Sequence, residues 1–257
     1  MRISSVLIAN RGEVAVRVAR AGAELGIHTV AIFSEDDAQS LHVRKADEAH
    51  PLRGQGAAAY LDVEQLLSIA HATHCTAVHP GYGFLSEQAH FARRCTQTGL
   101  VFIGPQAESL EIFGDKARAR LLAEQEDIPV IAGTSHPTSL EEARAFLAKL
   151  APGNAMLIKA FAGGGGRGMR VVSRPEELDE AYARCQSEAR AAFGQAGVYV
   201  EQLLRHARHI EVQIVGDALG GVTHLWEREC TLQRRHQKLV EVAPSPALPG
   251  ELRERLT

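Results

Sequence analysis

The 257-residue chain is predicted to be an α/β protein in which a parallel sheet is followed by a mixed or antiparallel region. Two features of the pattern support this. Short apolar, β-branched runs alternate with helical patterns over the first 110 or so residues, as in sheets that helices cover on both faces. Further along, helices become sparser and short strands follow one another with turns between them. Apolar residues make up 45% of the chain and charged residues 23%, which is typical of a folded domain.

The first region, residues 1–112, is expected to contain four strands, at 6–9, 28–33, 76–78 and 100–103. Apolar residues at helical spacing predict a helix over 13–25, which ends at Gly26. A second helix is expected to follow Asp62, a good N-cap residue, and a third to begin at Ser86 and Glu87. Because strands and helices alternate across short connections, these strands are predicted to form one parallel sheet.

The second region, residues 113–257, is expected to combine fewer helices with more strands. Helices are predicted over 115–125, 138–150 and 175–192. Strands are predicted over 155–160, 169–172, 198–201, 210–215, 222–226 and 238–242. Successive strands with turns between them favour an antiparallel or mixed arrangement here.

Charge and composition exclude several functional classes. Lys and Arg total 28 and Asp and Glu total 31, so the formal charge is 28 − 31 = −3, which argues against a nucleic-acid-binding protein. No apolar run approaches the ~18 residues of a membrane helix, and the first apolar stretch is too short for a signal peptide. Four scattered cysteines form no metal or redox motif and are predicted to be reduced. A cytoplasmic protein without a membrane partner is expected.

A glycine-rich segment, residues 163–168, is the first candidate binding element. It fits Gly-x-Gly-x-x-Gly, but a strand-like Met-Arg-Val-Val follows where a dinucleotide-binding loop needs a helix, and no Gly-Lys-Ser/Thr is present. A glycine hairpin between strands can bring its backbone N–H groups close to phosphate oxygens. The alternative interpretation is a mobile surface hairpin.

Two lysines accompany this segment. Lys159 lies in an apolar strand four residues before it, where an ammonium group is costly unless it faces an anion or reaches solvent at the strand end. Lys116 follows Phe-Gly-Asp, and its local sequence alone favours a solvated lysine in the first turn of a helix. Beside a phosphate-type loop, the anion-binding interpretation is preferred for Lys159.

A charged segment, residues 227–238, is the second candidate element. If it continues as one strand, Arg234, His236 and Lys238 share a face and could hold an anion. The alternative is a charged surface hairpin. The strand that ends at residues 201–204 could also present its backbone to the edge of a nucleotide base.

Several segments together resemble the biotin carboxylase family, the ATP-grasp component of acetyl-CoA, propionyl-CoA and pyruvate carboxylases. The matching strings are Ile-Ala-Asn-Arg-Gly-Glu (8–13), His-Pro-Gly-Tyr-Gly-Phe-Leu-Ser-Glu (79–87), Phe-Ile-Gly-Pro (102–105), Gly-Asp-Lys (114–116), Lys-Ala-Phe-Ala-Gly-Gly-Gly-Gly-Arg-Gly-Met-Arg (159–170) and Glu-Arg-Glu-Cys-Thr-Leu-Gln-Arg-Arg-His-Gln-Lys (227–238). The resemblance covers the whole chain. It implies a pre-ATP-grasp domain over 1–112 and a partial ATP-grasp domain over 113–257, with a lid at about 130–200.

The resemblance also implies roles for individual residues. Lys116 and Lys159 would bind the phosphates of ATP, and Gly165 and Gly166 would close over them. Tyr82 and Gly83 would face the carboxylation site, and Lys238, with His236 beside it, would help to hold bicarbonate. The residues that would surround the adenine are Glu201, Gln202, Leu203, Leu204, His209, Gln233 and His236.

The implied reaction carboxylates biotin. Bicarbonate attacks the γ-phosphate to give carboxyphosphate and ADP, and the CO₂ released from it reaches N1′ of a biotin on a biotinyl carrier domain. Mg²⁺ or Mn²⁺, a carboxyltransferase component and a homodimeric assembly belong to the implied system. No metal ligand is assigned among these residues, because the family domain continues for nearly as many residues again and its metal-binding carboxylates are expected there. The chain is therefore expected to be an N-terminal portion, inactive alone.

Two alternative functions remain open, and one residue differs from the usual family pattern. A carbamoyl-phosphate synthetase-like ATP-grasp ligase also phosphorylates bicarbonate but uses no biotin; the strings at 79–87 and 234–238 argue against it. A non-catalytic nucleotide-binding module is the second alternative, and ATP binding without bicarbonate-dependent ADP release would identify it. Gln202 stands where many members of the family carry lysine, which is expected to weaken nucleotide binding slightly.

Overall fold

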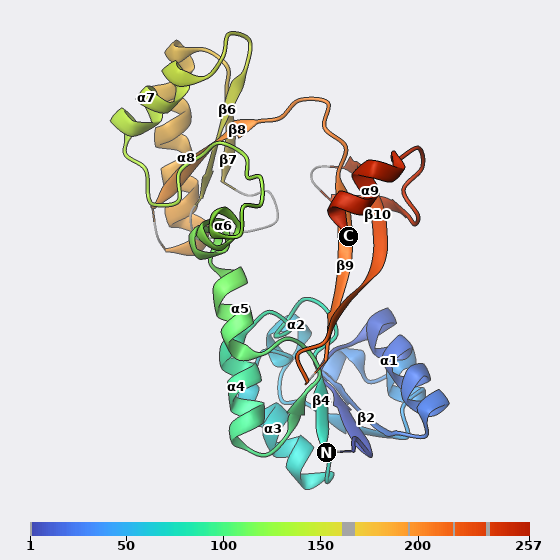
Figure 1. Ribbon diagram of the computed structural model, residues 1–257. Coiled ribbons are helices and arrows are strands. Elements are labelled where there is room, and N and C mark those ends of the chain that lie inside the picture. The colour runs from blue at the N-terminus through green and yellow to red at the C-terminus, as the bar shows by residue number, and fades with distance from the viewer. Residues whose placement is uncertain (1, 161–167, 195, 218, 235–236) are drawn as a thin grey trace. The chain divides into compact units, whose positions relative to one another are not determined.

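The computed structural model describes residues 2–160, 168–194, 196–217, 219–234 and 237–257 (Figure 1). It divides into two compact units, Met1–Asp115 and Lys116–Thr257. The first contains a parallel sheet and the second contains antiparallel sheets, so the predicted fold class is confirmed. Among the described helices, none is both long enough and apolar enough to cross a membrane.

The first unit is built on a five-stranded parallel sheet with the order β3-β2-β1-β4-β5. The strands are β1 (Ser5–Ile8), β2 (His28–Phe33), β3 (Glu48–Pro51), β4 (Ala77–His79) and β5 (Val101–Phe102). The sequence pattern does not predict β3, because Glu-Ala-His-Pro contains no apolar run. Its place at the edge of the sheet explains this composition, since edge strands tolerate charged residues and proline.

Helices cover both faces of this sheet (Figure 1). They are α1 (Gly12–Leu25), α2 (Gly56–Ala59), α3 (Val63–Ala72), α4 (Ala89–Gln97) and α5 (Ala107–Gly114), with 3₁₀ turns at Glu35–Asp37 and Leu41–Arg44. Gly26 ends α1 with a φ of 66°, and the Asp62 carboxylate accepts a hydrogen bond from the Gln65 N–H at the start of α3, both as predicted.

In the first unit, one predicted helix start is wrong, and two helices, α2 and α5, are missed. Residues 83–88 form turns in which the Ser86 N–H donates to the Gly83 carbonyl and the Gln88 N–H to that of Leu85. The helix α4 therefore begins three residues later, at Ala89, than the expected start at Ser86. The helix α5, which precedes Asp115, was not predicted.

Alternation along β1 divides its side chains between the two faces of the sheet. Leu7 and Ala9 belong to a core that includes buried residues of α3 and α4, such as Leu66 and Phe91. Ile8 points the other way and packs against the small residues of α1. A strand buried on both faces must be apolar throughout, which is why this segment was recognisable from the sequence.

The second unit begins with α6 (Lys116–Gln125) and α7 (Leu140–Lys149). A three-stranded antiparallel sheet follows, with the order β7-β6-β8: β6 (Ala155–Ala160), β7 (Met169–Val172) and β8 (Val198–Leu203). A 3₁₀ turn at Pro175–Glu177 leads into α8 (Leu178–Phe193). One face of the sheet, with Met156, Ile158 and Val200, packs against α7 and α8, and the other face is left for polar side chains.

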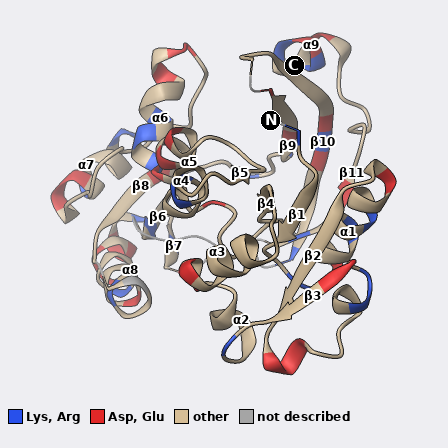
Figure 2. Ribbon diagram, turned by 90° about the horizontal axis from the view of Figure 1, so that it is seen from below, with Lys and Arg blue, Asp and Glu red and all other residues tan. Residues whose placement is uncertain are grey.

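A second antiparallel sheet has the order β11-β10-β9 and is followed by α9 (Gly250–Leu256). Its strands are β9 (Ile210–Gly216), β10 (Val222–Arg234) and β11 (Gln237–Val242). The strand β10 was predicted to end at Trp226, but it continues to Arg234. Opposite charges make this possible: Arg228 meets Glu211 of β9 and Glu241 of β11, whereas Glu227 and Glu229 meet arginines outside the sheet. Figure 2 shows red acidic segments on β10, whereas β1 is tan.

Candidate functional site

The predicted site residues fall into three local groups within the described part of the chain. One group lies on and beside the β7-β6-β8 sheet, one on the β11-β10-β9 sheet, and one at the end of β4 in the first unit. Gly165, Gly166 and His236 lie outside the described residues.

The first group is centred on Lys159 of β6. In the antiparallel register, Lys159 is opposite Tyr199 and Leu157 is opposite Glu201, so all four side chains share the face that α7 and α8 leave open. The Lys159 ammonium donates a hydrogen bond to a carboxylate oxygen of Glu201, and the two side chains are 24% and 18% exposed. The anion that a lysine in an apolar strand requires is therefore supplied within this sheet.

Lys116 joins this group from the first turn of α6. Its ammonium lies 5.8 Å from the centre of the Tyr199 ring, within range of a cation–π contact. The residue as a whole is exposed, as the local sequence favours, but its ammonium is partly desolvated. This desolvation and the positive charge of Lys159 lower the pKa of Lys116, while the charge of Glu201 acts in the opposite direction.

The end of β8 is held by a segment that the sequence analysis missed, residues 132–134. The Gln202 N–H donates to the Ala132 carbonyl and the Thr134 N–H to the Val200 carbonyl, each at 2.8 Å. Gly133 forms an isolated antiparallel β-bridge with Glu201. A Cβ atom on Gly133 would lie 2.7 Å from the Val200 carbonyl oxygen. Only glycine fits this approach, and Gly133 was the one available sequence signal. The N–H of Gln202 is already engaged, and Leu204 beyond the strand is exposed.

The second group surrounds Glu211 of β9, which the sequence analysis also missed. The Lys238 ammonium donates to Glu211 Oε2 at 2.5 Å, and His209 Nε2 lies 3.3 Å from the same oxygen. Arg228 Nη2 is 2.5 Å from the other oxygen, and Gln233 Nε2 is 3.0 Å from His209 Nδ1. The structure thus brings His209, Gln233 and Lys238 together. In the sequence, Glu211 lies between two β-branched residues of a predicted strand, and this position was the signal that could have identified it.

The Glu211 carboxylate is strongly stabilised in its charged form. Burial alone would raise its pKa, but the hydrogen bond from Lys238 and the charges of Arg228 and Lys238 outweigh burial and hold the pKa of Glu211 at about 2. The same hydrogen bond raises the pKa of Lys238. Both groups are therefore charged throughout the neutral range.

The prediction that Arg234 and Lys238 share one cationic face is wrong. Arg234 is the last residue of β10 and Lys238 lies in β11, so these two residues belong to different, antiparallel strands. Gln233 is opposite Lys238 and Arg234 is opposite Gln237, and directly opposed residues share a face. Lys238 therefore lies on the face of Gln233, and Arg234 lies on the other face.

The third group is the turn after β4, which contains Tyr82 and Gly83. Asn10, at the end of β1, is buried, and its side-chain N–H₂ donates to the carbonyls of Pro80 at 2.6 Å and Tyr82 at 2.9 Å. The Tyr82 ring is exposed, and its hydroxyl is 3.4 Å from Glu13. The order of the parallel sheet reverses between β1 and β4, and ligands of α/β sheets bind at such points. The positioning role of Asn10 was not predicted.

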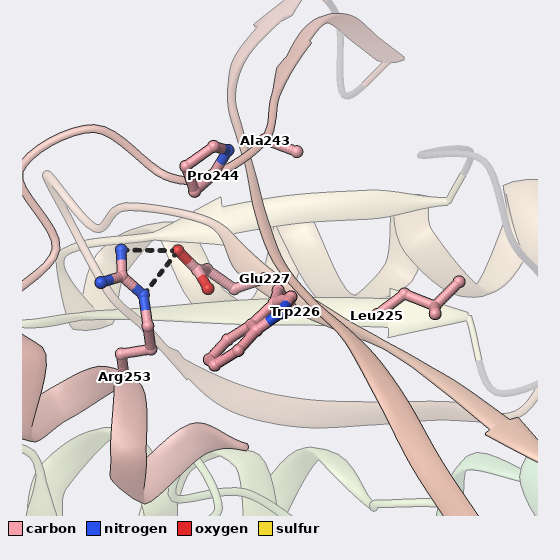
Figure 3. A pocket seen from close by; sticks show the side chains of 6 residues that line it. All are labelled: Leu225, Trp226, Glu227, Ala243, Pro244 and Arg253. Carbon is pink, nitrogen blue, oxygen red and sulfur yellow. Dashed lines mark hydrogen bonds and ion pairs between the residues drawn. The ribbon is translucent and has the colours of Figure 1, made fainter.

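A cavity of about 530 Å³ lies elsewhere in the second unit (Figure 3). Its lining residues are Leu225, Trp226, Glu227, Ala243, Pro244 and Arg253. The buried Glu227 carboxylate accepts hydrogen bonds from Arg253 at 2.9 and 3.0 Å, which ties α9 to β10. None of the predicted site residues lines this cavity.

The second unit is of an ATP-binding class, as a family model that matches more than half of the chain shows. Residues 2–110 match the model of the biotin carboxylase N-terminal domain. Residues 115–257 match that of the carbamoyl-phosphate synthase L chain ATP-binding domain. The chain belongs to the biotin carboxylase family, with an ATP-binding domain of the type that carbamoyl-phosphate synthases share.

Curated relatives agree with this family. The chain is 53% identical over 257 residues to pyruvate carboxylase of Bacillus subtilis (strain 168) and 52% identical over 259 residues to mitochondrial pyruvate carboxylase of Homo sapiens. Each alignment covers 99% of this chain and 22% of the relative. The chain therefore spans about a fifth of the length of the curated relatives that it matches.

Solved structures give the same result. The biotin carboxylase domain of Hydrogenobacter thermophilus 2-oxoglutarate carboxylase, a dimer in complex with MgADP, ADP and bicarbonate, matches with a TM-score of 0.93 and 43% identity, over 99% of this chain and 56% of that one. A biotin carboxylase from Campylobacter jejuni in a β,γ-ATP complex matches with a TM-score of 0.94 and 38% identity, over 99% and 57%. The predicted family resemblance is confirmed.

Proposed function

We propose that this chain supplies nucleotide- and bicarbonate-binding residues of an ATP-dependent biotin carboxylase. The observation that carries the proposal is the approach of Lys116, from α6, to Lys159 and Glu201 on the sheet face that α7 and α8 leave open. It occurs in a chain 43% identical to a biotin carboxylase domain solved with MgADP and bicarbonate. In this reaction bicarbonate attacks the γ-phosphate of ATP, and the carboxyphosphate formed supplies CO₂ to biotin.

The residues have separate tasks in this proposal. Phosphoryl transfer from ATP is catalysed mainly by positioning and by stabilising negative charge. Lys116 and Lys159 bind the phosphates, and the backbone amides of Gly165 and Gly166 close over them in a lid at about 130–200. Lys238, with His236 nearby, holds bicarbonate in exchange for part of its contact with Glu211.

Binding of the base and of biotin involves the remaining residues. The partly exposed end of β8 and the turn after β4 are the surfaces proposed for these two ligands. Tyr82 and Gly83 face the carboxylation site. The adenine is bordered by Glu201, Gln202, Leu203, Leu204, His209, Gln233 and His236.

A divalent metal accompanies the nucleotide in this proposal, but the described residues do not fit it. Glu211, Cys230 and Glu241 come within 4.8 Å of one another. Mg²⁺ prefers oxygen ligands, and Glu211 is already neutralised by Lys238 and Arg228. We therefore assign no ligand for Mg²⁺ or Mn²⁺ here and derive no step through the metal.

The whole-enzyme context is part of the proposal as well. A biotinyl carrier domain delivers biotin, a carboxyltransferase component uses the carboxybiotin, and the module works as a homodimer in the cytoplasm. The dimeric biotin carboxylase domain of the Hydrogenobacter enzyme supports the assembly.

Nucleotide binding is tested on the chain itself by calorimetry with MgATP. Lys159→Gln is expected to weaken binding by about 10- to 150-fold, which corresponds to about 1.5–3 kcal/mol for a charged hydrogen bond. The control is Lys149→Gln, which removes an exposed lysine from the end of α7 and should leave the affinity unchanged. Unchanged affinity in a folded Lys159→Gln variant would refute the phosphate-binding role.

The catalytic part is tested in a chimera. Residues 1–257 replace the matching segment of Bacillus subtilis pyruvate carboxylase, to which they are 53% identical. We expect bicarbonate-dependent release of ADP and carboxylation of biotin. A folded chimera that binds ATP but releases no ADP when bicarbonate is added would instead favour the non-catalytic nucleotide-binding module.

A further inference from the structure

We propose that Glu229 is a positioning residue: its carboxylate holds Arg208 and Thr231, and through them it fixes the backbone of His209. This inference rests on the proposed function, in which His209 borders the adenine. Glu229, Arg208 and Thr231 themselves lie outside the set of residues proposed to bind ATP, bicarbonate or biotin.

The first support is a chain of hydrogen bonds that ends at the backbone of His209. The Thr231 hydroxyl donates to a carboxylate oxygen of Glu229 at 2.8 Å and accepts from the His209 N–H at 3.0 Å. Because a hydroxyl has a single hydrogen, its bond to Glu229 directs the lone pairs of Thr231 toward the N–H. The His209 carbonyl accepts from the Cys230 N–H at 2.8 Å, so both backbone groups of His209 are held.

The second support is the side chain of Arg208, the residue before His209. Its guanidinium donates to both carboxylate oxygens of Glu229, from Nε at 3.1 Å and from Nη2 at 2.5 Å. A contact of this kind fixes the orientation of the guanidinium as well as its distance. The hydrogen bonds from Arg208 and Thr231 hold the pKa of Glu229 at about 2, so the carboxylate is charged at neutral pH.

The third support is a buried serine that completes the surroundings of the carboxylate. Ser245 Oγ donates to Glu229 Oε2 at 2.9 Å and accepts from Arg208 Nη2 at 2.9 Å. Donors from three separate segments of the chain thus occupy the two oxygens of Glu229. The carboxylate cannot turn away from Thr231 without losing several hydrogen bonds.

The fourth support is that Glu229 and the His209 ring work from opposite faces of the sheet. Arg228 is directly opposite Glu211, so these two residues share a face, and Glu229, one residue further along β10, lies on the other. The His209 ring reaches the Glu211 carboxylate, with Nε2 3.3 Å from Oε2, and its Nδ1 lies 3.0 Å from Gln233 Nε2. Glu229 therefore acts on the ring through the backbone.

The experiment uses nuclear magnetic resonance on the isotope-labelled, nucleotide-free chain. It follows the nuclear Overhauser effect between the His209 ring and the Gln233 carboxamide hydrogens, which reports their distance, and the exchange rate of the His209 amide. In Thr231→Val, which removes the hydroxyl and keeps the shape, we expect the amide to exchange about 2- to 13-fold faster, as for one lost hydrogen bond, and the ring signal to weaken. Glu229→Ala, which leaves Thr231 in place, should change both readouts in the same direction.

Two controls separate this role from a general loss of structure. Asp179→Asn removes the partner of Arg144, an exposed ion pair elsewhere in the second unit, and should change neither readout. The rings of His224 and Trp226, whose centres are 5.1 Å apart on the same strand β10, provide an internal reference for folding.

Thr231→Ser keeps the hydroxyl and should restore both readouts. Wild-type signals from His209 in a folded Glu229→Ala variant would overturn the inference. A Thr231→Ser variant that behaves like Thr231→Val would overturn it as well, because the hydroxyl would then not be the group that matters.

Kinetics give a second readout in the chimera with Bacillus subtilis pyruvate carboxylase. Glu229→Ala should raise the KM for ATP, but it should have little further effect in His209→Gln, because Glu229 acts through His209. Additive effects of the two substitutions would overturn the inference. The magnetic-resonance readouts need neither nucleotide nor activity, so they decide the role of Glu229 even if an inactive chimera refutes the proposed function.

Discussion

The parallel sheet of the first unit and the β11-β10-β9 sheet of the second are stabilised in different ways. All four residues of β1 are buried, and its apolar side chains pack against helices on both faces. By contrast, all six residues of β11 are exposed, including Leu239 and Val240. Ion pairs join the strands and loops of this second sheet, among them Glu211 with Lys238 and Glu229 with Arg208, each at 2.5 Å.

This difference implies different responses to solvent conditions. Burial of apolar surface depends little on pH or salt, whereas ion pairs at partly exposed sites weaken with salt and disappear when the carboxylates are protonated. The first unit should therefore be sensitive to cavities, and the second sheet to acid. The four predictions below test this contrast, beginning with the largest expected effect.

Phe91→Ala should destabilise the first unit by about 3–5 kcal/mol, as is usual when a buried aromatic side chain is removed. Phe91 is fully buried and meets Phe102 edge-on, with ring centres 5.8 Å apart. Hydrogen exchange of peptides from β1 and β4 should accelerate accordingly. The control is His90→Ala, an exposed neighbour whose replacement should have little effect. A loss of unfolding free energy below 1 kcal/mol would contradict the view that buried apolar side chains stabilise the first unit.

Glu211→Gln should destabilise the second sheet by on the order of 2 kcal/mol at pH 7, because the pKa of Glu211 is held at about 2 instead of 4.5. A carboxyl group whose pKa is lowered in the folded state stabilises the fold when the pH is above its pKa in the unfolded chain. This stabilisation is lost as the pH falls toward its pKa in the folded state. The difference in unfolding free energy between wild type and variant should thus shrink as the pH falls from 5 to 2. Urea unfolding followed by the fluorescence of Trp226, the single tryptophan, measures it. A gap that is constant with pH would exclude an ionic origin.

His42 gives the first unit a pH response in a different range. Its ring is buried, with Nε2 3.1 Å from the Ile32 carbonyl, and burial lowers the pKa of His42. Because the unfolded chain then binds the proton more readily, stability falls as pH drops below about 6.5, by at most about 1.4 kcal/mol per pH unit. Hydrogen exchange in β2 should show this slope in wild type and a smaller one in His42→Asn. If wild type and His42→Asn had equal slopes, the pH dependence of stability would come from another histidine.

Leu239→Ser should have the smallest effect, within about 0.5 kcal/mol, because the side chain is 63% exposed. Urea unfolding detected by Trp226 again provides the measurement. Ile32→Ser, a fully buried counterpart in β2, should be severely destabilising. A loss of 2 kcal/mol or more in Leu239→Ser would show that β11 is covered in solution and would remove the contrast between the sheets.

The sequence by itself determined much of the local structure. The spans predicted for β2, β6 and β7 agree with the structure, because apolar and β-branched runs specify buried strands directly. Gly26 and Asp62 end and begin helices as predicted, since capping depends on a few neighbouring residues. An anion beside Lys159 was also predicted, from its apolar strand together with the glycine-rich segment that follows.

Only the tertiary structure decided which groups meet. The anion beside Lys159 is Glu201, 42 residues along the chain, and its place depends on the register of β6 with β8. Glu211 unites His209, Gln233 and Lys238 in the same way, and the hairpin separates Arg234 from Lys238. Local periodicity reports which face a residue takes within its own strand. The pairing of strands is a long-range choice set by packing, and no local pattern of residues contains it.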